Sequence, residues 1–179
     1  MFSRGDTIDF DSQGLFGPNS FADAGPAQTL SITTSVGVVT LQGGVILTGE
    51  TGNADTSSVY ATINSSQMTN PITIMFPIPV TNFSLTVDTG VGFAVTYIVA
   101  DNAGHSQSST VPVNGVFQPS FAMAGTTVTV DAVPTALHPN FWDFSIDNIA
   151  FDSVPEPSSM VLSVIGLGGL ALVTRGGQV

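Results

Sequence analysis

Three aspartates near the two ends of the chain offer metal-binding chemistry. Asp9 and Asp11 alternate with apolar residues in an early segment, and Asp147 lies in a similar alternating segment far along the chain. Carboxylate oxygens are hard ligands of the kind that Ca²⁺ binds, although the spacing matches no EF-hand loop. If the first and last strands are neighbours, these aspartates form a candidate calcium site. The alternative is that solvent or backbone N–H groups satisfy them.

The alternation around Asp147 does not fit a regular strand. Phe144 and Ile146 point to one face, whereas Ile149 and Phe151 share the face of Asp147. Either a β-bulge shifts the alternation or the carboxylate faces the core. A buried carboxylate needs a cation or backbone N–H donors, and the chain contains only two basic residues, both arginines.

The remaining polar residues give little support for catalysis. His105 and His138 are far apart in sequence and belong to no HExxH-type zinc motif. The segment from Gly104 to Ser108 lacks the closing glycine of a nucleophile elbow. Residues 101–104, Asp-Asn-Ala-Gly, favour a hairpin turn over a metal-binding loop because they supply short side chains and a glycine. We therefore expect a non-catalytic protein.

Aromatic side chains that could stack on sugar rings are few. Trp142, Phe141 and the two tyrosines are the candidates for such a platform, but aromatic residues make up only 8% of the chain. Trp142 lies beside an alternating strand, so a place in the core is the favoured interpretation for its ring.

The composition excludes several classes of protein. A formal net charge of −11 over 179 residues would repel the phosphates of a nucleic acid. The absence of cysteine excludes disulfides, thiolate catalysis and cysteine-ligated metal sites. Val, Ile, Leu and Phe together number 54, which is enough apolar material for one core.

β-Branched residues dominate the balance and predict an all-β fold. Val and Thr number 21 each and Ile 11, whereas Glu numbers two. With 19 Gly and 11 Pro between short apolar runs, we expect a jelly-roll-like β-sandwich over residues 6–153. Strands are predicted at residues 7–11, 59–63, 72–76, 83–87, 93–99, 111–117, 126–130 and 141–151, with two or three more within 30–48 joined by a turn at Gly43-Gly44.

The composition changes sharply at Val154, which begins a second segment, residues 154–179. Pro155-Glu156-Pro157 is followed by fourteen uncharged, almost wholly apolar residues, 160–173, and then by Arg175. A helix of this length spans about 21 Å, short of the ~30 Å hydrocarbon core of a bilayer. We expect a short apolar helix that associates with a membrane, the alternative being a last helix or strand of the core. The residues of the apolar span are Met160, Val161, Leu162, Val164, Ile165, Leu167, Leu170, Leu172 and Val173.

The first residues of the chain carry no apolar run typical of a secretory signal. Either a leader is missing from this chain or the protein stays inside the cell.

The layout of residues 154–179 resembles the PEP-CTERM sorting signal of Gram-negative bacteria. The shared parts are the Pro155-Glu156-Pro157 box, the apolar span and the basic end at Arg175, which here is a single residue rather than a cluster. The resemblance implies that exosortase, a membrane-embedded cysteine transpeptidase, processes the chain at the box. The inner membrane would then hold the protein transiently before it reaches the cell surface or is secreted, often among exopolysaccharide.

The body also resembles the β-domain of many PEP-CTERM proteins, which is similar to carbohydrate-binding jelly rolls. The shared pieces are residues 8–11, 44–47 and 144–151. In such jelly rolls the first and last strands lie together, and a structural Ca²⁺ often joins them. The resemblance therefore implies a calcium ion near Asp9, Asp11 and Asp147.

These features predict a non-catalytic cell-surface or extracellular-matrix protein that is sorted by exosortase. Two alternatives stay open: a carbohydrate-binding module for exopolysaccharide, and a self-assembling extracellular structural subunit. The negative charge predicts that contact with anionic polymers requires bridging divalent ions.

Overall fold

The computed structural model describes residues 5–49, 57–65, 67–133, 135, 137 and 142–154, and this part of the chain is all-β. One four-residue helix is the exception to the strands in these ranges. The elements are β1 (Asp6–Ile8), α1 (Phe21–Ala24), β2 (Gln28–Thr34), β3 (Gly37–Thr48), β4 (Ser58–Ile63), β5 (Ile72–Met75), β6 (Val80–Thr89), β7 (Val95–Asp101), β8 (Ser106–Val111), β9 (Val116–Phe117), β10 (Ser120–Ala124), β11 (Thr127–Val133) and β12 (Asp143–Ser153).

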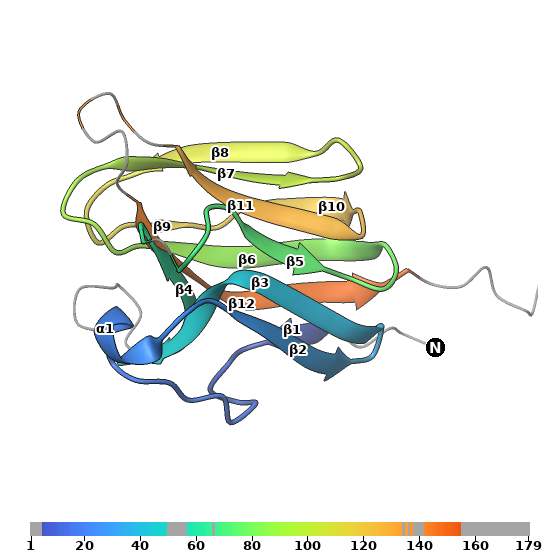
Figure 1. Cartoon of the computed structure of the whole chain (residues 1–179). Helices are drawn as coiled ribbons and strands as arrows, with labels where there is room; N and C mark the ends of the chain where they lie inside the picture. The colour runs from blue at the N-terminus through green and yellow to red at the C-terminus, as the bar shows by residue number, and fades with distance from the viewer. Residues whose placement is uncertain are drawn as a thin grey trace, which may run out of the picture.

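The strands form one continuous, strongly curved sheet whose two halves enclose the core (Figure 1). The order of hydrogen-bonded strands is β10-β6-β12-β4-β3-β5-β11-β7-β8, with β1 added to β12, β2 to β3 and β9 to β6. All the pairings are antiparallel. The predicted all-β class is therefore confirmed.

β3 connects the two halves of the sheet because it bends at Gly43-Gly44. Its first part pairs with β2 and β5, and its second part pairs with β4. Gly43 has φ +104°, a conformation that favours glycine. A Cβ on Gly44 would lie only 2.4 Å from the carbonyl oxygen of Ala61. The glycine pair therefore bends one continuous strand, and the prediction of a turn between two strands at this point is wrong.

The two ends of the strand order are tied together, so the sheet is nearly closed. Gln107 of β8 donates its side-chain amide to the carbonyl of Ser120 in β10. Its Oε1 accepts a hydrogen bond from the Ser120 N–H at 3.2 Å. The Gln107 side chain thus replaces a ladder pair, and it occupies backbone groups that an edge strand leaves open.

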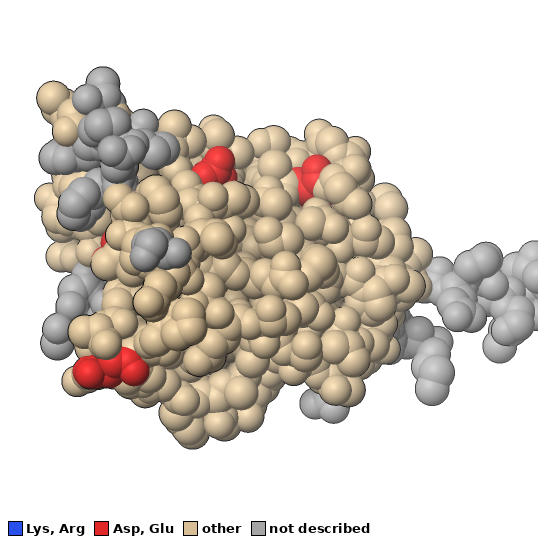
Figure 2. Space-filling view, in the orientation of Figure 1, with Lys and Arg blue, Asp and Glu red and all other residues tan. Residues whose placement is uncertain are grey.

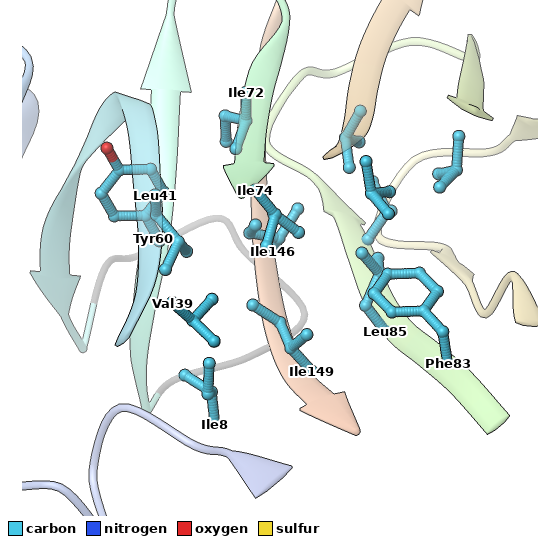
Figure 3. Close-up of a cluster of buried hydrophobic side chains, with 14 of the residues drawn as sticks. Ile8, Val39, Leu41, Tyr60, Ile72, Ile74, Phe83, Leu85, Ile146 and Ile149 are labelled. Atoms are coloured by element: carbon cyan, nitrogen blue, oxygen red, sulfur yellow. The ribbon is translucent and has the colours of Figure 1, made fainter. Parts of the chain in front are cut away.

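The main core lies between the two halves of the sheet and is built from alternate residues of nearly every strand (Figure 3). The ring of Phe76 meets the rings of Phe83 and Phe151 edge-on, with centroids 6.0 and 5.0 Å apart. The labelled part of this core comprises Ile8, Val39, Leu41, Tyr60, Ile72, Ile74, Phe83, Leu85, Ile146 and Ile149.

A smaller cluster covers the other face of β3 and β4. Val45, Leu47 and Val59 are buried there, and Phe21 of α1 packs against them. The short helix therefore covers sheet surface that would otherwise be exposed. This explains why five consecutive residues of β4 are buried although a strand with one solvated face would alternate.

Two predicted strands end earlier than the alternation suggested. β1 stops at Ile8 rather than continuing to Asp11. The predicted strand at residues 111–117 is interrupted after Val111 by a turn in which Asn114 has φ +54° and the Gly115 N–H donates to the carbonyl of Pro112. Turn chemistry overrides β-propensity at both places.

β12 contains a β-bulge. The sequence allowed either such a bulge or a carboxylate of Asp147 that faces the core. The pairing with β6 shifts between Asp147 and Ala150, and Asn148 has φ +51°. Phe144 and Ile146 before the bulge and Ile149 and Phe151 after it all reach the main core. The bulge therefore shifts the alternation by one residue, as the sequence required.

The predicted C-terminal helix lies outside the described residues, as does the whole sorting segment after Val154. Among the helices of the described ranges, none is long and apolar enough to cross a membrane.

Candidate functional site

The loop after β1 holds two of the three candidate calcium ligands. The Oδ1 of Asp9 accepts hydrogen bonds from the backbone N–H groups of Asp11 and Ser12, at 3.1 and 3.5 Å. The Oδ1 of Asp11 accepts one from the N–H of Ser58, the first residue of β4, at 3.1 Å. Each aspartate therefore has a structural task that needs no metal: Asp9 shapes the turn, and Asp11 ties the turn to β4.

The third candidate, Asp147, lies in the bulge of the strand that pairs with β1. The antiparallel register places Ile8 opposite Ile149, so the chain after β1 runs towards the bulge. Asp147 is only 2% exposed, and its Oδ2 accepts a hydrogen bond from the side-chain amide of Asn148 at 3.0 Å. The adjacency of the first and last strands, which the family resemblance implied, is present.

The calcium site itself stays a prediction. No group of three or more histidine and acidic side chains lies at metal-binding distance within the part of the chain that the structure describes. Thermal unfolding with added Ca²⁺ and with EDTA tests the site. A bound ion at a hundred times its Kd would add about 2.7 kcal/mol to the free energy of unfolding. Identical melting curves would contradict a calcium site.

Asp101 joins two neighbouring turns at one end of the sheet. The hairpin turn predicted at residues 101–104 is confirmed between β7 and β8. The Oδ1 of Asp101 accepts hydrogen bonds from the N–H groups of Ala103 and His105, at 3.0 and 2.8 Å. Its Oδ2 accepts one from the N–H of Gly125, before β11, at 2.9 Å. The carboxylate therefore holds the β7–β8 and β10–β11 turns together.

His105 completes this arrangement. Its Nδ1 lies 2.7 Å from the Oδ2 of Asp101, and its ring lies against Phe121 with centroids 5.8 Å apart. Burial of Asp101 alone would raise the pKa of its carboxyl, but the hydrogen bonds from His105 and Gly125 outweigh burial and lower that pKa below 3.8. The His105 ring is partly exposed and acts here as a support for the turn.

We expect Asp101→Ala to lower the free energy of unfolding by about 3 kcal/mol, because three backbone N–H groups lose a charged acceptor. Since the folded-state pKa lies below the unfolded value, this contribution is present above about pH 4 and is lost as the pH falls through the lowered pKa. Urea unfolding at pH 7 and pH 3 measures both effects.

Asp131→Ala is the matched control, because Asp131 is a half-buried aspartate on β11 and its replacement removes the same charge. We expect that control to change the unfolding free energy by less than about 0.5 kcal/mol at pH 7. Equal losses in the two variants would contradict the role of Asp101.

A buried polar group that the sequence did not suggest lies near the start of β12. Tyr97 is fully buried beside Thr89, and the carboxylates of Asp88 and Asp143 are near enough to act on its hydroxyl. Burial raises the pKa of Tyr97 to about 12; the hydroxyl of Thr89 opposes this rise and the charges of Asp143 and Asp88 add to it. Regular alternation in β6 places Thr89 on the core face. This alternation was the sequence signal that could have predicted a polar side chain in the core.

Of the aromatic residues considered for a sugar platform, the three that the structure describes do not form one. Both tyrosines are fully buried, and Trp142 packs against the main core, as expected. Phe141 and His138 lie outside the described residues. Phe16 is the exposed aromatic residue in the part of the chain that the structure describes, and 69% of its surface is accessible to solvent.

The comparisons with known proteins give no family for this chain. No protein-family model matches it, and no curated protein matches it. The sorting residues Pro155, Glu156, Pro157 and Arg175 and the apolar span lie beyond Val154, outside the described residues.

Proposed function

We propose that this chain is a non-catalytic protein of the cell surface or extracellular matrix of a Gram-negative bacterium. Exosortase would recognise the Pro155-Glu156-Pro157 box, and the apolar span with Arg175 would hold the protein transiently in the inner membrane. The observation that carries the proposal is the position of the box relative to the body. β12 ends at Ser153, Val154 is exposed, and the box follows at once.

The described part of the body has a core and a paired last strand of its own, which supports this assignment. The main core is built from residues between Ile8 and Phe151. β12 is paired with β6 on one side and with β4 and β1 on the other. Cleavage at the box would therefore release a domain that keeps its described core and every strand of the described ranges.

The chemistry of the box also suits processing. Each proline fixes its own φ and favours an extended conformation in the residue before it, so the box offers an extended strip to a protease cleft. Within the all-β class, we propose a jelly-roll fold for the body, which the pairing of its first and last strands supports. The negative charge of the body would keep it soluble after release.

Replacing both box prolines with alanine tests the sorting proposal. We expect the double variant P155A/P157A to stay in the membrane fraction of its host, whereas the unmodified protein is released. The unfolding free energy of the body should change by less than about 0.5 kcal/mol, because the substitutions lie after its last strand. Ser158→Ala with Ser159→Ala is the control and should be released normally. Normal release of the proline variant would contradict the proposal.

Carbohydrate binding is the second candidate, favoured by the exposed ring of Phe16. An exposed aromatic face suits the apolar face of a pyranose ring. Retention on exopolysaccharide beads that is lost in Phe16→Ala would support this function, and unchanged retention would exclude this ring.

A further inference from the structure

β2 is an outer strand whose second edge is open. It pairs with β3 alone, through a hairpin in which Thr34 lies opposite Gly37 across a two-residue turn. In such a hairpin the pair next to the turn exchanges hydrogen bonds, and the pairs then alternate. Ile32 therefore directs its backbone groups to β3, whereas Ser31 and Thr33 direct theirs away from the sheet.

Space for another strand lies directly beside this edge. Ser31 and Thr33 are exposed, and in the described part of the chain no hydrogen bond reaches their outward N–H and C=O groups. An open depression of about 400 Å³ lies along the edge. It is lined by Ser31, Ile32 and Thr33 on one side and by Gln13 and Leu15 of the loop after β1 on the other.

β2 has a bulge before Leu30, and the carboxylate of Asp6 accepts a hydrogen bond from the N–H of Ser35 just after its end, at 2.6 Å, so its open part is the middle of the strand. The other edges of the sheet are more fully protected. β8 and β10 are tied together through Gln107, and β1 has only three residues. Edge strands are usually protected by a charge, a proline, a bulge or a covering element. Residues 30–34 of β2 contain no charged residue and no proline and pair regularly with β3. β2 is therefore the edge that is available for pairing.

We propose that the open edge of β2 binds β2 of a second copy of this chain, in antiparallel pairing about a two-fold axis. Charge favours the middle of this edge for a protein that carries −11, because residues 24–49 contain no charged side chain and the carboxylate of Asp6 reaches the hairpin at Ser35, beyond the end of β2. Figure 2 shows no acidic side chain over β2 and β3 on the face turned to the viewer. Two identical anionic molecules can approach here with the least repulsion.

The sequence of β2 is self-complementary in this arrangement. With Ser31 opposite Ser31 of the second copy, Thr33 faces Thr29 on the outer face, and Leu30 faces Ile32 on the inner face. Pairs of hydroxyl side chains and pairs of aliphatic side chains both stabilise antiparallel strands. The same register places the outward backbone groups of Ser31 opposite those of Ser31 in the second copy, so that this central pair exchanges its N–H and C=O bonds. Thr29 lies at the bulge of β2, so regular pairing extends over residues 30–33.

A single cysteine tests the register, because the chain has none of its own. Opposed Cα atoms of a hydrogen-bonded antiparallel pair lie about 5.5 Å apart, within the range of a disulfide. The full chain carrying Ser31→Cys, oxidised in mild detergent, should form disulfide dimers of twice its 18.4 kDa mass. Ser108→Cys is the matched control, because Ser108 is also exposed and lies on β8, at the other end of the same half-sheet.

We expect at least about tenfold more cross-linked dimer from Ser31→Cys than from Ser108→Cys, because pairing raises the local thiol concentration to the millimolar range. Equal cross-linking of the two variants would overturn the proposal. A protein that stays monomeric at all concentrations would also overturn the proposal. The same holds if the monomer binds a different protein through this edge.

Thr33→Pro provides the second variant. It removes an outward N–H without removing a bond to β3, so the monomer should fold while cross-linking of Ser31→Cys is lost. Thr33→Val keeps that N–H and should keep the dimer. A proline variant that has native circular dichroism and still cross-links would contradict strand pairing.

Discussion

Raising the pH from 10 to 12 is expected to unfold the body, because both of its tyrosines are buried as neutral phenols. Tyr60 donates its hydroxyl to the carbonyl of Gln28 and accepts a hydrogen bond from the N–H of Gly44 at 3.0 Å. Burial raises the pKa of Tyr60 to about 12, against the lowering effect of the Gly44 bond. Burial also raises the pKa of Tyr97 to about 12.

The sign of the pH effect follows from proton binding. Between pH 10 and 12 the folded protein keeps both phenolic protons, whereas the unfolded chain loses them, so the stability is full below pH 10 and falls as the pH rises. At about 1.4 kcal/mol for each pKa unit, the two tyrosines together remove up to about 5 kcal/mol. That is comparable to the whole stability of a small domain.

Phenolate absorbance and circular dichroism measure this transition together. The chain has two tyrosines, so the titration reports on these positions alone. We expect phenolate to form above pH 11 and in step with the loss of β-structure. Phenolate that forms near pH 10 in a protein with native circular dichroism would contradict the burial of the tyrosines. Tyr97→Phe should make the alkaline loss of stability about half as large.

Gly44→Ala is expected to cost about 3 kcal/mol of unfolding free energy, although it adds a single methyl group. The new Cβ would lie 2.4 Å from the carbonyl oxygen of Ala61 and 3.0 Å from the ring of Tyr60. The neighbour is the backbone of β4, which cannot move without breaking its pairing with β3. The bend that joins the two halves of the sheet therefore leaves no room for a side chain at Gly44.

Gly92→Ala is the control for this prediction. No atom lies within 4 Å of a Cβ at Gly92 outside its chain neighbours, and its φ is not in the left-handed region. Urea unfolding of the two variants should differ by about 3 kcal/mol, with Gly92→Ala within about 0.5 kcal/mol of the unmodified protein. Equal stability of the two variants would show that β3 does not bend against β4 as described.

The strands that the sequence predicted well are those with a regular apolar face. β5, β7 and β11 match predicted strands within a few residues, because burial on one face imposes a period of two on each. β4 and β12 also match predicted strands, although β4 is buried on both faces and β12 has a bulge. β8 was missed because Ser106 to Thr110 are polar and mostly exposed. Such a strand exists through its pairing with β7, which no local pattern reports.

The candidate site was predictable only where local chemistry decides the structure. Residues 101–104 formed the expected turn because the side chain of Asp101 bonds to nearby N–H groups. That Asp101 also holds Gly125 depends on how two distant turns meet, and nothing in either segment shows it. The burial of Asp88 and Tyr97 likewise results from the meeting of β6, β7 and β12.

The intact mass of the protein recovered from the surface or medium of its native host tests the central claim most directly. The claim is that residues 154–179 are a removable sorting segment and that residues 6–153 are the functional body. We predict a mass that lacks the apolar span and ends at or near the Pro155-Glu156-Pro157 box. A mature protein that retains the chain through Arg175 would contradict the account.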